Sequence, residues 1–295
     1  MPQQDDLFDS AFLQRLEYLR IVSRRIVTGT AQGGRTGRRT GPGLEFAEHR
    51  AYVAGDDFRH IDWAAFGRLE RLLLRLCQQE EDLAIHFLVD ASASMGTGGP
   101  PKFDHARRVA AALAYVGLAS LDRVRLVAID DGVRSHKESG RGKSHILGVL
   151  EFLRGLTMGG RTDLARSVEA FLPHAPHGGL AVLISDFLDE AGYERPLTTL
   201  QGRGFDVWCL QVTDPADLAP PGAGDLAATD AETGETLGIH LTDEVRRRIA
   251  GEAERFGLDL RTWCLSRGIG HAEASTHVPA DVLVLDVLRH GGLLC

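Results

Sequence analysis

The stretch Leu83-Ala-Ile-His-Phe-Leu-Val-Asp90-Ala-Ser92-Ala-Ser94-Met-Gly96 decides the fold expected for this chain of 295 residues. It begins as a continuous apolar run of strand length and ends in a carboxylate followed by two hydroxyls at alternate positions. A run that is apolar on both faces is typical of a strand in the middle of a sheet that helices cover. The polar tail then falls where such sheets bind ligands, in the loop at the carboxyl end of a central strand. A carboxylate and two hydroxyls offer only oxygen, which favours a hard cation such as Mg²⁺.

The chain beyond this stretch alternates between strand and helix patterns. We expect further strands over residues 124–130, 133–137, 180–186 and 205–212, with helices over 101–122, 145–156, 163–172 and 193–201 between them. A hairpin over 225–241, a helix over 242–256, a strand over 258–265 and a helix from 279 complete the prediction. Repeated strand–helix units joined by short loops predict an α/β fold, a doubly wound, mostly parallel sheet with helices on both faces.

The expected organisation is an accessory segment over residues 1–80 and an α/β domain with a C-terminal extension over 81–295. The accessory segment combines a helix over 8–25, a Gly/Arg-rich loop over 28–43 and the motif Gly55-Asp-Asp-x-Arg-x-Ile-Asp-Trp63. Aspartates and arginines are dense over residues 43–63. We interpret them as a compact ordered segment whose charges pair with one another or cap a helix, with a role in partner contact as the second choice.

Composition excludes several classes of protein. The net charge of −8 makes no general case for binding nucleic acid, and the basic loop over 28–43 is better explained as a mobile surface loop than as a phosphate-binding arm. The four cysteines are far apart in sequence, which argues against a zinc site or a disulfide framework and fits a reducing compartment. No segment has the roughly 20 consecutive apolar residues of a membrane span, and the acidic, polar start is not a secretory signal. We expect a cytoplasmic protein that does not enter a membrane.

Three separated motifs are expected to meet at one edge of the sheet. Asp90 and Asp186 end the two strands that lie side by side at the centre of a doubly wound sheet. Between them in sequence, the glycine loop Met158-Gly-Gly-Arg-Thr162-Asp163 presents a hydroxyl, and Thr162 is suited to cap the helix that follows.

These motifs resemble the metal-ion-dependent adhesion site of von Willebrand factor A-type domains. That family carries Asp-x-Ser-x-Ser, then a threonine, then an aspartate, which match Asp90, Ser92 and Ser94, then Thr162, then Asp186. The resemblance implies that these five residues bind Mg²⁺ or Mn²⁺, some directly and some through water. It also implies an open coordination position that an acidic residue of another protein fills. Phe187 stands where many members have glycine, a departure expected to alter the rim of the pocket.

The segment before the domain resembles that of a bacterial family of unknown function. The shared residues are Gly43-x-Glu-Phe46, Arg50-x-Tyr52 and the motif that ends at Ile61-Asp-Trp63. Members carry such a metal site and are typically encoded beside MoxR-type AAA ATPases. The resemblance therefore implies a non-enzymatic, metal-dependent interaction module. It would work with such an ATPase, and with a protein client that offers an acidic residue, in assembly, maturation or stress-related remodelling.

Two other functions compete with this expectation. A Mg²⁺-dependent phosphoryl-transfer or hydrolytic enzyme would also use an aspartate such as Asp90 at a strand end. Such enzymes generally need a second carboxylate or a supporting lysine, and the position two after Asp90 is Ser92. Neither a P-loop nor a G-x-S-x-G motif is present. A nucleic-acid module built on residues 20–39 is the third choice and predicts binding that weakens steeply with salt.

Overall fold

A computed structural model of the chain describes residues 7–19, 40–41, 45–53, 56–58, 61–78, 84–99, 101–218, 222 and 224–290. It divides into two compact units, one of Thr30–Asp82 and one of Met1–Gly29 with Leu83–Cys295. The division therefore differs from the expected boundary at residue 80, because the start of the chain belongs to the larger unit. Within the described residues, no helix is long and apolar enough to cross a membrane.

The larger unit includes a helix that begins at residue 10, two residues after the expected start, and is described to residue 19. Residues 20–25 of the expected helix lie outside the described part. Its apolar residues recur at helical spacing and are buried, namely Phe8, Phe12, Leu16 and Leu19. The Arg108 Nε donates a hydrogen bond of 3.0 Å to the Leu7 carbonyl, and the Tyr115 hydroxyl donates one to Glu17. Burial of this apolar face explains why the segment packs on the α/β unit.

The larger unit is built on a six-stranded sheet of order β11-β8-β7-β4-β5-β6. Its strands are β4 (Ala84–Asp90), β5 (Arg123–Ile129), β6 (Val133–Ser139), β7 (Gly179–Ser185), β8 (Phe205–Thr213) and β11 (Gly270–Ser275). All neighbours run parallel except β6, which is antiparallel to β5. In chain order this is the doubly wound arrangement, with the reversal between the central strands β4 and β7. The α/β fold expected from the sequence is confirmed.

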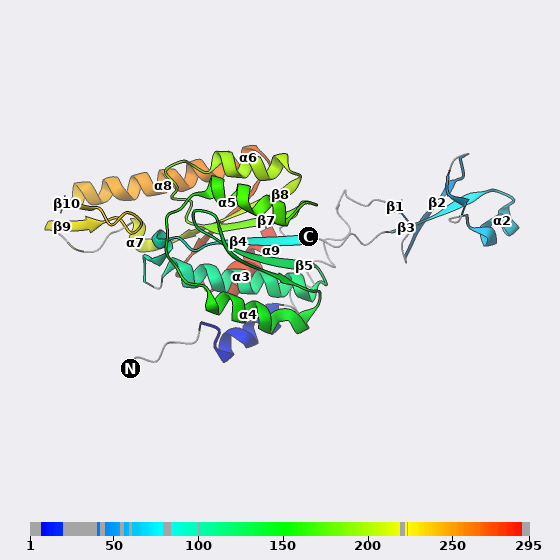
Figure 1. The fold of residues 1–295 in the computed structure, drawn as a ribbon, viewed down its shortest axis with the longest axis horizontal. Helices are drawn as coiled ribbons and strands as arrows, with labels where there is room; N and C mark the ends of the chain where they lie inside the picture. The colour runs from blue at the N-terminus through cyan, green and yellow to red at the C-terminus, as the bar shows by residue number, and fades with distance from the viewer. Residues whose placement is uncertain are drawn as a thin grey trace. The chain divides into compact units, whose positions relative to one another are not determined.

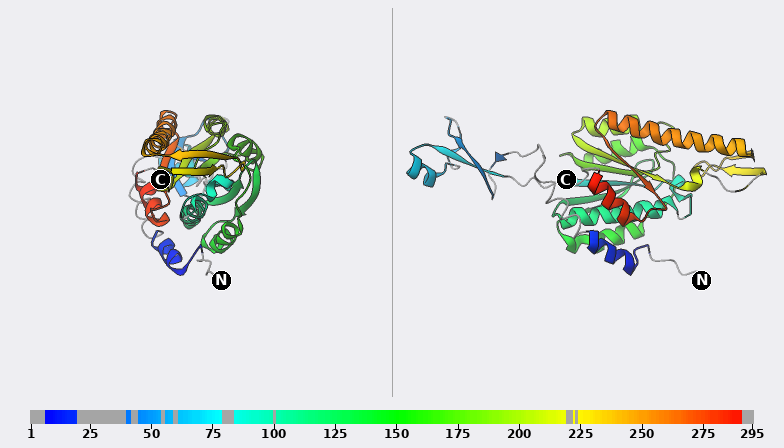
Figure 2. Two further views of the ribbon diagram at one scale, coloured as in Figure 1. Left: turned by 90° about the vertical axis from the view of Figure 1, so that its left-hand side faces the viewer. Right: turned by 180° about the vertical axis from the view of Figure 1, so that it is seen from behind.

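Helices cover both faces of this sheet (Figures 1 and 2). One face carries α3 (Lys102–Ala119), α4 (Ile146–Gly155) and α9 (Ala280–His290), and the other carries α5 (Leu164–Phe171), α6 (Glu194–Gly202) and α8 (Asp243–Ser266). A hydrophobic core lies on each face of the sheet, and successive residues of β4 point into opposite cores. Phe87 and Val89 pack in the core under α3, and Leu88 packs in the core under α5 and α6. The continuous apolar runs of β4 and β7 thus have a physical reason, because both of their faces are buried.

Gly179, the first residue of β7, is required by close backbone approach. Its φ is +123°, and a Cβ there would lie 2.3 Å from the Ala84 carbonyl oxygen of the neighbouring strand. An L side chain is therefore excluded by both conformation and space. The two central strands, which carry the aspartates of interest at their other ends, meet tightly at this point.

The C-terminal third corrects one expectation. Residues 258–265 were expected to form a strand, but they continue α8, in which Leu260 and Cys264 face the core four residues apart. The edge strand on this side of the sheet is β11, a short segment in which glycine and alanine, and no large apolar residue, alternate with polar residues. The expected hairpin is confirmed as β9 (Gly224–Thr229) and β10 (Thr236–Leu241), which follow the short helix α7 (Pro215–Leu218).

The smaller unit pairs β1 (Thr40–Gly41), β2 (Glu45–Ala51) and β3 (Leu73–Gln78) in an antiparallel sheet with α2 (Trp63–Leu69). Asp62 caps α2 by accepting from Ala65 N, and it also bonds to His49 at 2.9 Å. Arg50 pairs with Asp56 at 2.8 Å. The interpretation of these charges as helix caps and internal ion pairs is confirmed. Most of the Gly/Arg-rich loop over 28–43 lies outside the described residues.

Candidate metal centre

Asp90 ends β4 inside the protein. Its carboxylate accepts hydrogen bonds from Ser92 N at 2.9 Å and from the Ser185 hydroxyl at 2.5 Å, and its side chain is fully buried. Burial, and then the nearby charge of Asp186, raise the pKa of Asp90 to about 6. A cation close to this carboxylate would favour its ionised form. The two expected aspartates are therefore neighbours, as the strand order requires.

Ser92 and Ser94 bring their hydroxyls together in the loop after β4. Their Oγ atoms lie 3.0 Å apart at the start of a single 3₁₀ turn, Ala93–Gly96. Two oxygens that bind one Mg²⁺ at about 2.1 Å and at right angles to each other also lie about 3.0 Å apart. The spacing of the two hydroxyls thus suits neighbouring positions around a small divalent cation.

Asp186 has a partner that the sequence prediction missed. The Lys102 ammonium donates a hydrogen bond of 2.7 Å to Asp186 Oδ2, and both side chains are almost fully buried. Lys102 also lies 3.6 Å from Asp217, while Asp186 Oδ1 accepts from Leu188 N. A sequence signal existed, because a lysine in the first turn of a helix opposes the helix dipole and so needs another reason to be there.

Thr162 lies on a loop that is bound to the loop after Asp90. Gly159 N donates to the Ala91 carbonyl at 2.9 Å, and Ala93 N donates to the Gly160 carbonyl at 3.1 Å. The Thr162 hydroxyl itself donates to Glu232 on the β9–β10 hairpin. The expectation that Thr162 caps α5 is wrong, since Asp163 is the cap and accepts from Arg166 N at 2.8 Å.

Phe187 explains why glycine suits the position after Asp186. Its φ is +61°, a left-handed conformation that costs a residue with a Cβ roughly 1–2 kcal/mol. The expected change to the pocket rim is wrong, because the Phe187 side chain is only 1% exposed and packs in the core under α5 and α6. Burial of the aromatic ring offsets the strained backbone.

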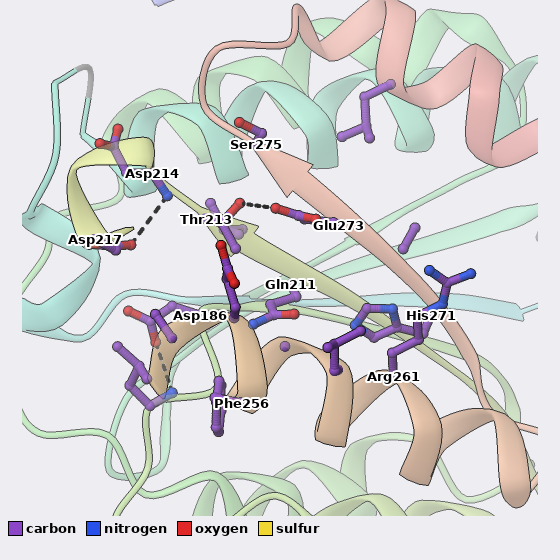
Figure 3. A pocket seen from close by; sticks show the side chains of 18 of the residues that line it. Asp186, Gln211, Thr213, Asp214, Asp217, Phe256, Arg261, His271, Glu273 and Ser275 are labelled. Carbon is purple, nitrogen blue, oxygen red and sulfur yellow. Dashed lines mark hydrogen bonds between the residues drawn. The ribbon is translucent and has the colours of Figure 1, made fainter. Parts of the chain in front are cut away.

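A cleft of about 1360 Å³ runs past Asp186 between β8, β11 and α8. Figure 3 shows Asp186 with Asp214 and Asp217 to one side and Arg261 and His271 to the other. The charged residues that line the cleft are mostly acidic. In addition to the three aspartates just named, the carboxylates of Glu252, Glu254, Glu273 and Asp286 face it. The lining of the cleft beside Asp186 is therefore mostly acidic in the absence of a cation.

The donor set fits a hard divalent cation bound by few charges. Among the described residues, no three His, Cys, Asp or Glu side chains gather as a metal cluster. What gathers instead is Asp90 with the hydroxyls of Ser92 and Ser94 and with Asp186 nearby, and Thr162 lies on a loop bonded to the loop after Asp90. Such oxygen donors suit Mg²⁺ and do not suit a softer metal. Lys102 already supplies one positive charge to Asp186, so Asp90 and the hydroxyls are left as the groups that would hold the cation.

The fold and this group of residues define an α/β protein with a polar site at the carboxyl ends of its two central strands. Residues 48–257 match the family described as "Protein of unknown function DUF58", and the chain belongs to that family. An uncharacterised protein of Mycobacterium tuberculosis is 29% identical to it over 289 residues, which cover 96% of this chain and 90% of that protein. An uncharacterised protein of Mycobacterium avium is 35% identical over 103 residues, covering 35% of this chain and 60% of its own.

Two solved structures illustrate more distant likeness. The conserved hypothetical protein BatB from Bacteroides thetaiotaomicron has 14% identity and a TM-score of 0.41, covering 69% of this chain and 96% of its own. A von Willebrand factor type A structure from Catenulispora acidiphila has 13% identity and a TM-score of 0.39, covering 72% of this chain and 43% of that one.

Proposed function

We propose that this protein is a metal-dependent protein-interaction module whose site is formed by Asp90, Ser92, Ser94, Thr162 and Asp186. The observation that carries the proposal is the pair of serine hydroxyls 3.0 Å apart beside two buried aspartates. Neutral hydroxyl ligands leave a bound Mg²⁺ or Mn²⁺ with positive charge to spare. Asp90 holds the cation, the hydroxyls orient it, and a carboxylate from a partner completes the site.

The proposed partners are an acidic segment of a client protein and a MoxR-type AAA ATPase. The requirement for an acid follows from the charge of the site, whereas the ATPase rests on the family resemblance alone. The proposed location is the cytoplasm. Binding is the whole of the activity in this proposal, since no bond of the partner is made or broken.

The test is calorimetric titration with Mg²⁺ and Mn²⁺ in wild type, in the double variant Asp90→Ala/Ser92→Ala and in Asp206→Asn. Asp206 is an exposed carboxylate near the start of β8, at the opposite edge of the sheet. We expect wild type and Asp206→Asn to bind alike and the double variant to lose binding by at least about tenfold, because it lacks a charged ligand and a hydroxyl.

A capture experiment from lysate, with and without chelator, checks whether partners depend on the metal. An ATPase retained only when metal is present supports the partner proposed. If wild type and the double variant bind metal equally, or neither binds it, the proposal is wrong.

The second candidate is a Mg²⁺-dependent hydrolytic enzyme that uses Asp90, and one observation favours it. Lys102, buried against Asp186, is the kind of supporting lysine that phosphoryl-transfer enzymes use. Against it, Asp90 is fully buried, so its carboxylate presents no surface to a substrate. Hydrolysis of p-nitrophenyl phosphate that is lost in Asp90→Asn would favour this candidate over the interaction module.

A further inference from the structure

Glu232, a residue that none of the site motifs includes, binds the threonine of the proposed metal centre. Its Oε1 accepts from the Thr162 hydroxyl at 2.5 Å, and its Oε2 accepts from Thr162 N at 3.0 Å. The hydroxyl donates its proton in this bond, so its oxygen keeps lone pairs for a cation. One carboxylate thus holds both polar groups that this loop residue offers.

The hairpin turn is shaped to present Glu232. Asp230 Oδ1 accepts from Glu232 N and from Thr233 N, both at 2.8 Å. Gly234 closes the turn with a φ of +73°, a conformation that favours glycine. The Glu232 side chain therefore extends from an ordered turn and is half-buried against Thr162.

The rest of the hairpin has little to hold it in place. Most residues of β9 and β10 are exposed, and Leu237 keeps 68% of its surface in contact with solvent. The hairpin lies beside the first turns of α8 and forms a two-stranded sheet apart from the six-stranded one (Figure 1). The turn is joined to the site by the contact of Glu232 with Thr162, and the charge of Arg161 acts on Asp230 of the same turn. The other end of the hairpin is anchored by Leu241, which is buried. Loss of the Thr162 contact would therefore free the turn while the base of the hairpin stays attached.

We propose that Glu232 is an internal acidic ligand of the metal centre and occupies the place that a partner's carboxylate takes. This inference rests on the proposed function and specifies its regulation. With Glu232 bound, the hairpin covers the site and the chain supplies its own acid. A partner carboxylate must displace Glu232, and the hairpin then swings away as one piece because its own strand pairing stays intact.

The experiment uses Mn²⁺ as the metal and acetate as the carboxylate probe, with the full chain in three forms. These are wild type, Glu232→Gln and the matched control Glu235→Gln, an exposed glutamate of the same turn. Water-proton relaxation by protein-bound Mn²⁺ measures how many exchangeable waters the metal keeps, and calorimetry measures its affinity. Hydrogen–deuterium exchange of residues 158–163 and 224–241, with and without Mn²⁺, reports whether the hairpin is attached.

Glu232→Gln is expected to bind Mn²⁺ about tenfold more weakly, to show more exchangeable water on the metal, and to lose that water when acetate is added. Wild type and Glu235→Gln are expected to show less water and no response at the same acetate concentration. Exchange over 224–241 should rise only in Glu232→Gln.

If all three forms bind Mn²⁺ with the same affinity, relaxation and exchange, the internal ligand is refuted while the metal site stands. If wild type does not bind Mn²⁺ at all, the proposed function fails and the inference fails with it. Thermal unfolding of each form confirms that the variants are folded.

Discussion

Lys102 begins α3 with its ammonium group buried against Asp186. A cation in the first turn of a helix is unfavourable by several tenths of a kcal/mol, and burial of any charge costs far more unless it is paired. The hydrogen bond of 2.7 Å to Asp186 offsets both costs. This hydrogen bond also lowers the negative charge of the site, because the ammonium group of Lys102 permanently neutralises the carboxylate of Asp186.

Lys102→Met tests this role of the lysine. Removal of one member of a buried pair leaves Asp186 without its partner, so in the presence of chelator we expect the free energy of unfolding to fall by about 3–5 kcal/mol. Mg²⁺ should restore more stability to this variant than to wild type, because a cation then relieves both aspartates. Urea unfolding with EDTA and with Mg²⁺ measures both effects.

The control is Lys143→Met, a half-exposed lysine on the turn before α4. It should change little under either condition. If Mg²⁺ stabilises wild type and Lys102→Met equally, then Lys102 does not share Asp186 with a cation.

The helix over residues 10–19 belongs to the α/β unit, although the sequence predicted that this unit begins only at residue 81. It has one buried stripe, one exposed face and few polar ties, so its attachment depends on apolar packing against the face that carries α3 and α9. An ion pair of 3.6 Å between Arg15 and Asp281 adds little, since it is partly exposed. Apolar packing therefore holds the helix on the core, and the hydrogen bond from Tyr115 to Glu17 adds to it.

Leu16→Ala and Leu13→Ala form a matched pair for this helix. Leu16 is 2% exposed and Leu13 is 41% exposed, on the same helix. We expect Leu16→Ala to lower the free energy of unfolding by about 2–4 kcal/mol, and Leu13→Ala by less than about 1 kcal/mol. Denaturant unfolding measures both, and equal losses would contradict the packing described.

For the whole molecule, two buried histidines make stability depend on pH. Burial, and then the charge of Arg125, lower the pKa of His86 to about 4, and burial, then Arg108, does the same for His105. His86 packs edge-on against Phe171 and Phe205, and its burial and the charge of Arg125 outweigh the opposing charge of Glu138. Both histidines are therefore neutral in the folded protein at pH 7.

The sign of the pH effect follows from these values. The folded pKa lies below the unfolded value of about 6.5, so the unfolded chain takes up protons first, and stability is lost as pH falls from 6.5 towards 4. We expect each histidine to lower the free energy of unfolding at pH 5 by about 2 kcal/mol relative to its value above pH 7. Asp90 acts in the opposite sense, since its raised pKa adds stability as pH falls through 6.

His86→Gln separates these contributions. Between pH 6 and 5, with chelator present, the free energy of unfolding of this variant should fall less than that of wild type. The difference should be up to about 1.4 kcal/mol per pH unit, the slope for one proton taken up on unfolding. Urea unfolding at several pH values measures the slope. Identical slopes in the two proteins would contradict a neutral buried His86.

The sequence by itself determined the layers of the fold and the place of the site. Continuous apolar runs such as those of β4 and β7 are stable only with both faces covered, and the polar residues that end them must emerge at one edge of a parallel sheet. The strand predicted over residues 258–265 was wrong, because so short a pattern also suits a buried helix stripe, and Leu260 and Cys264 pack as part of α8.

Only the tertiary structure decided which polar groups meet. Lys102 and Asp186 are 84 residues apart in sequence, and Thr162 and Glu232 are 70 apart. Such pairs arise when separate loops are brought to one edge by the order of the strands and the reach of the hairpin, and no local pattern encodes that distance. The physical reason is that periodicity records which face of an element is buried, whereas the partner of a buried charge depends on everything that packs around it.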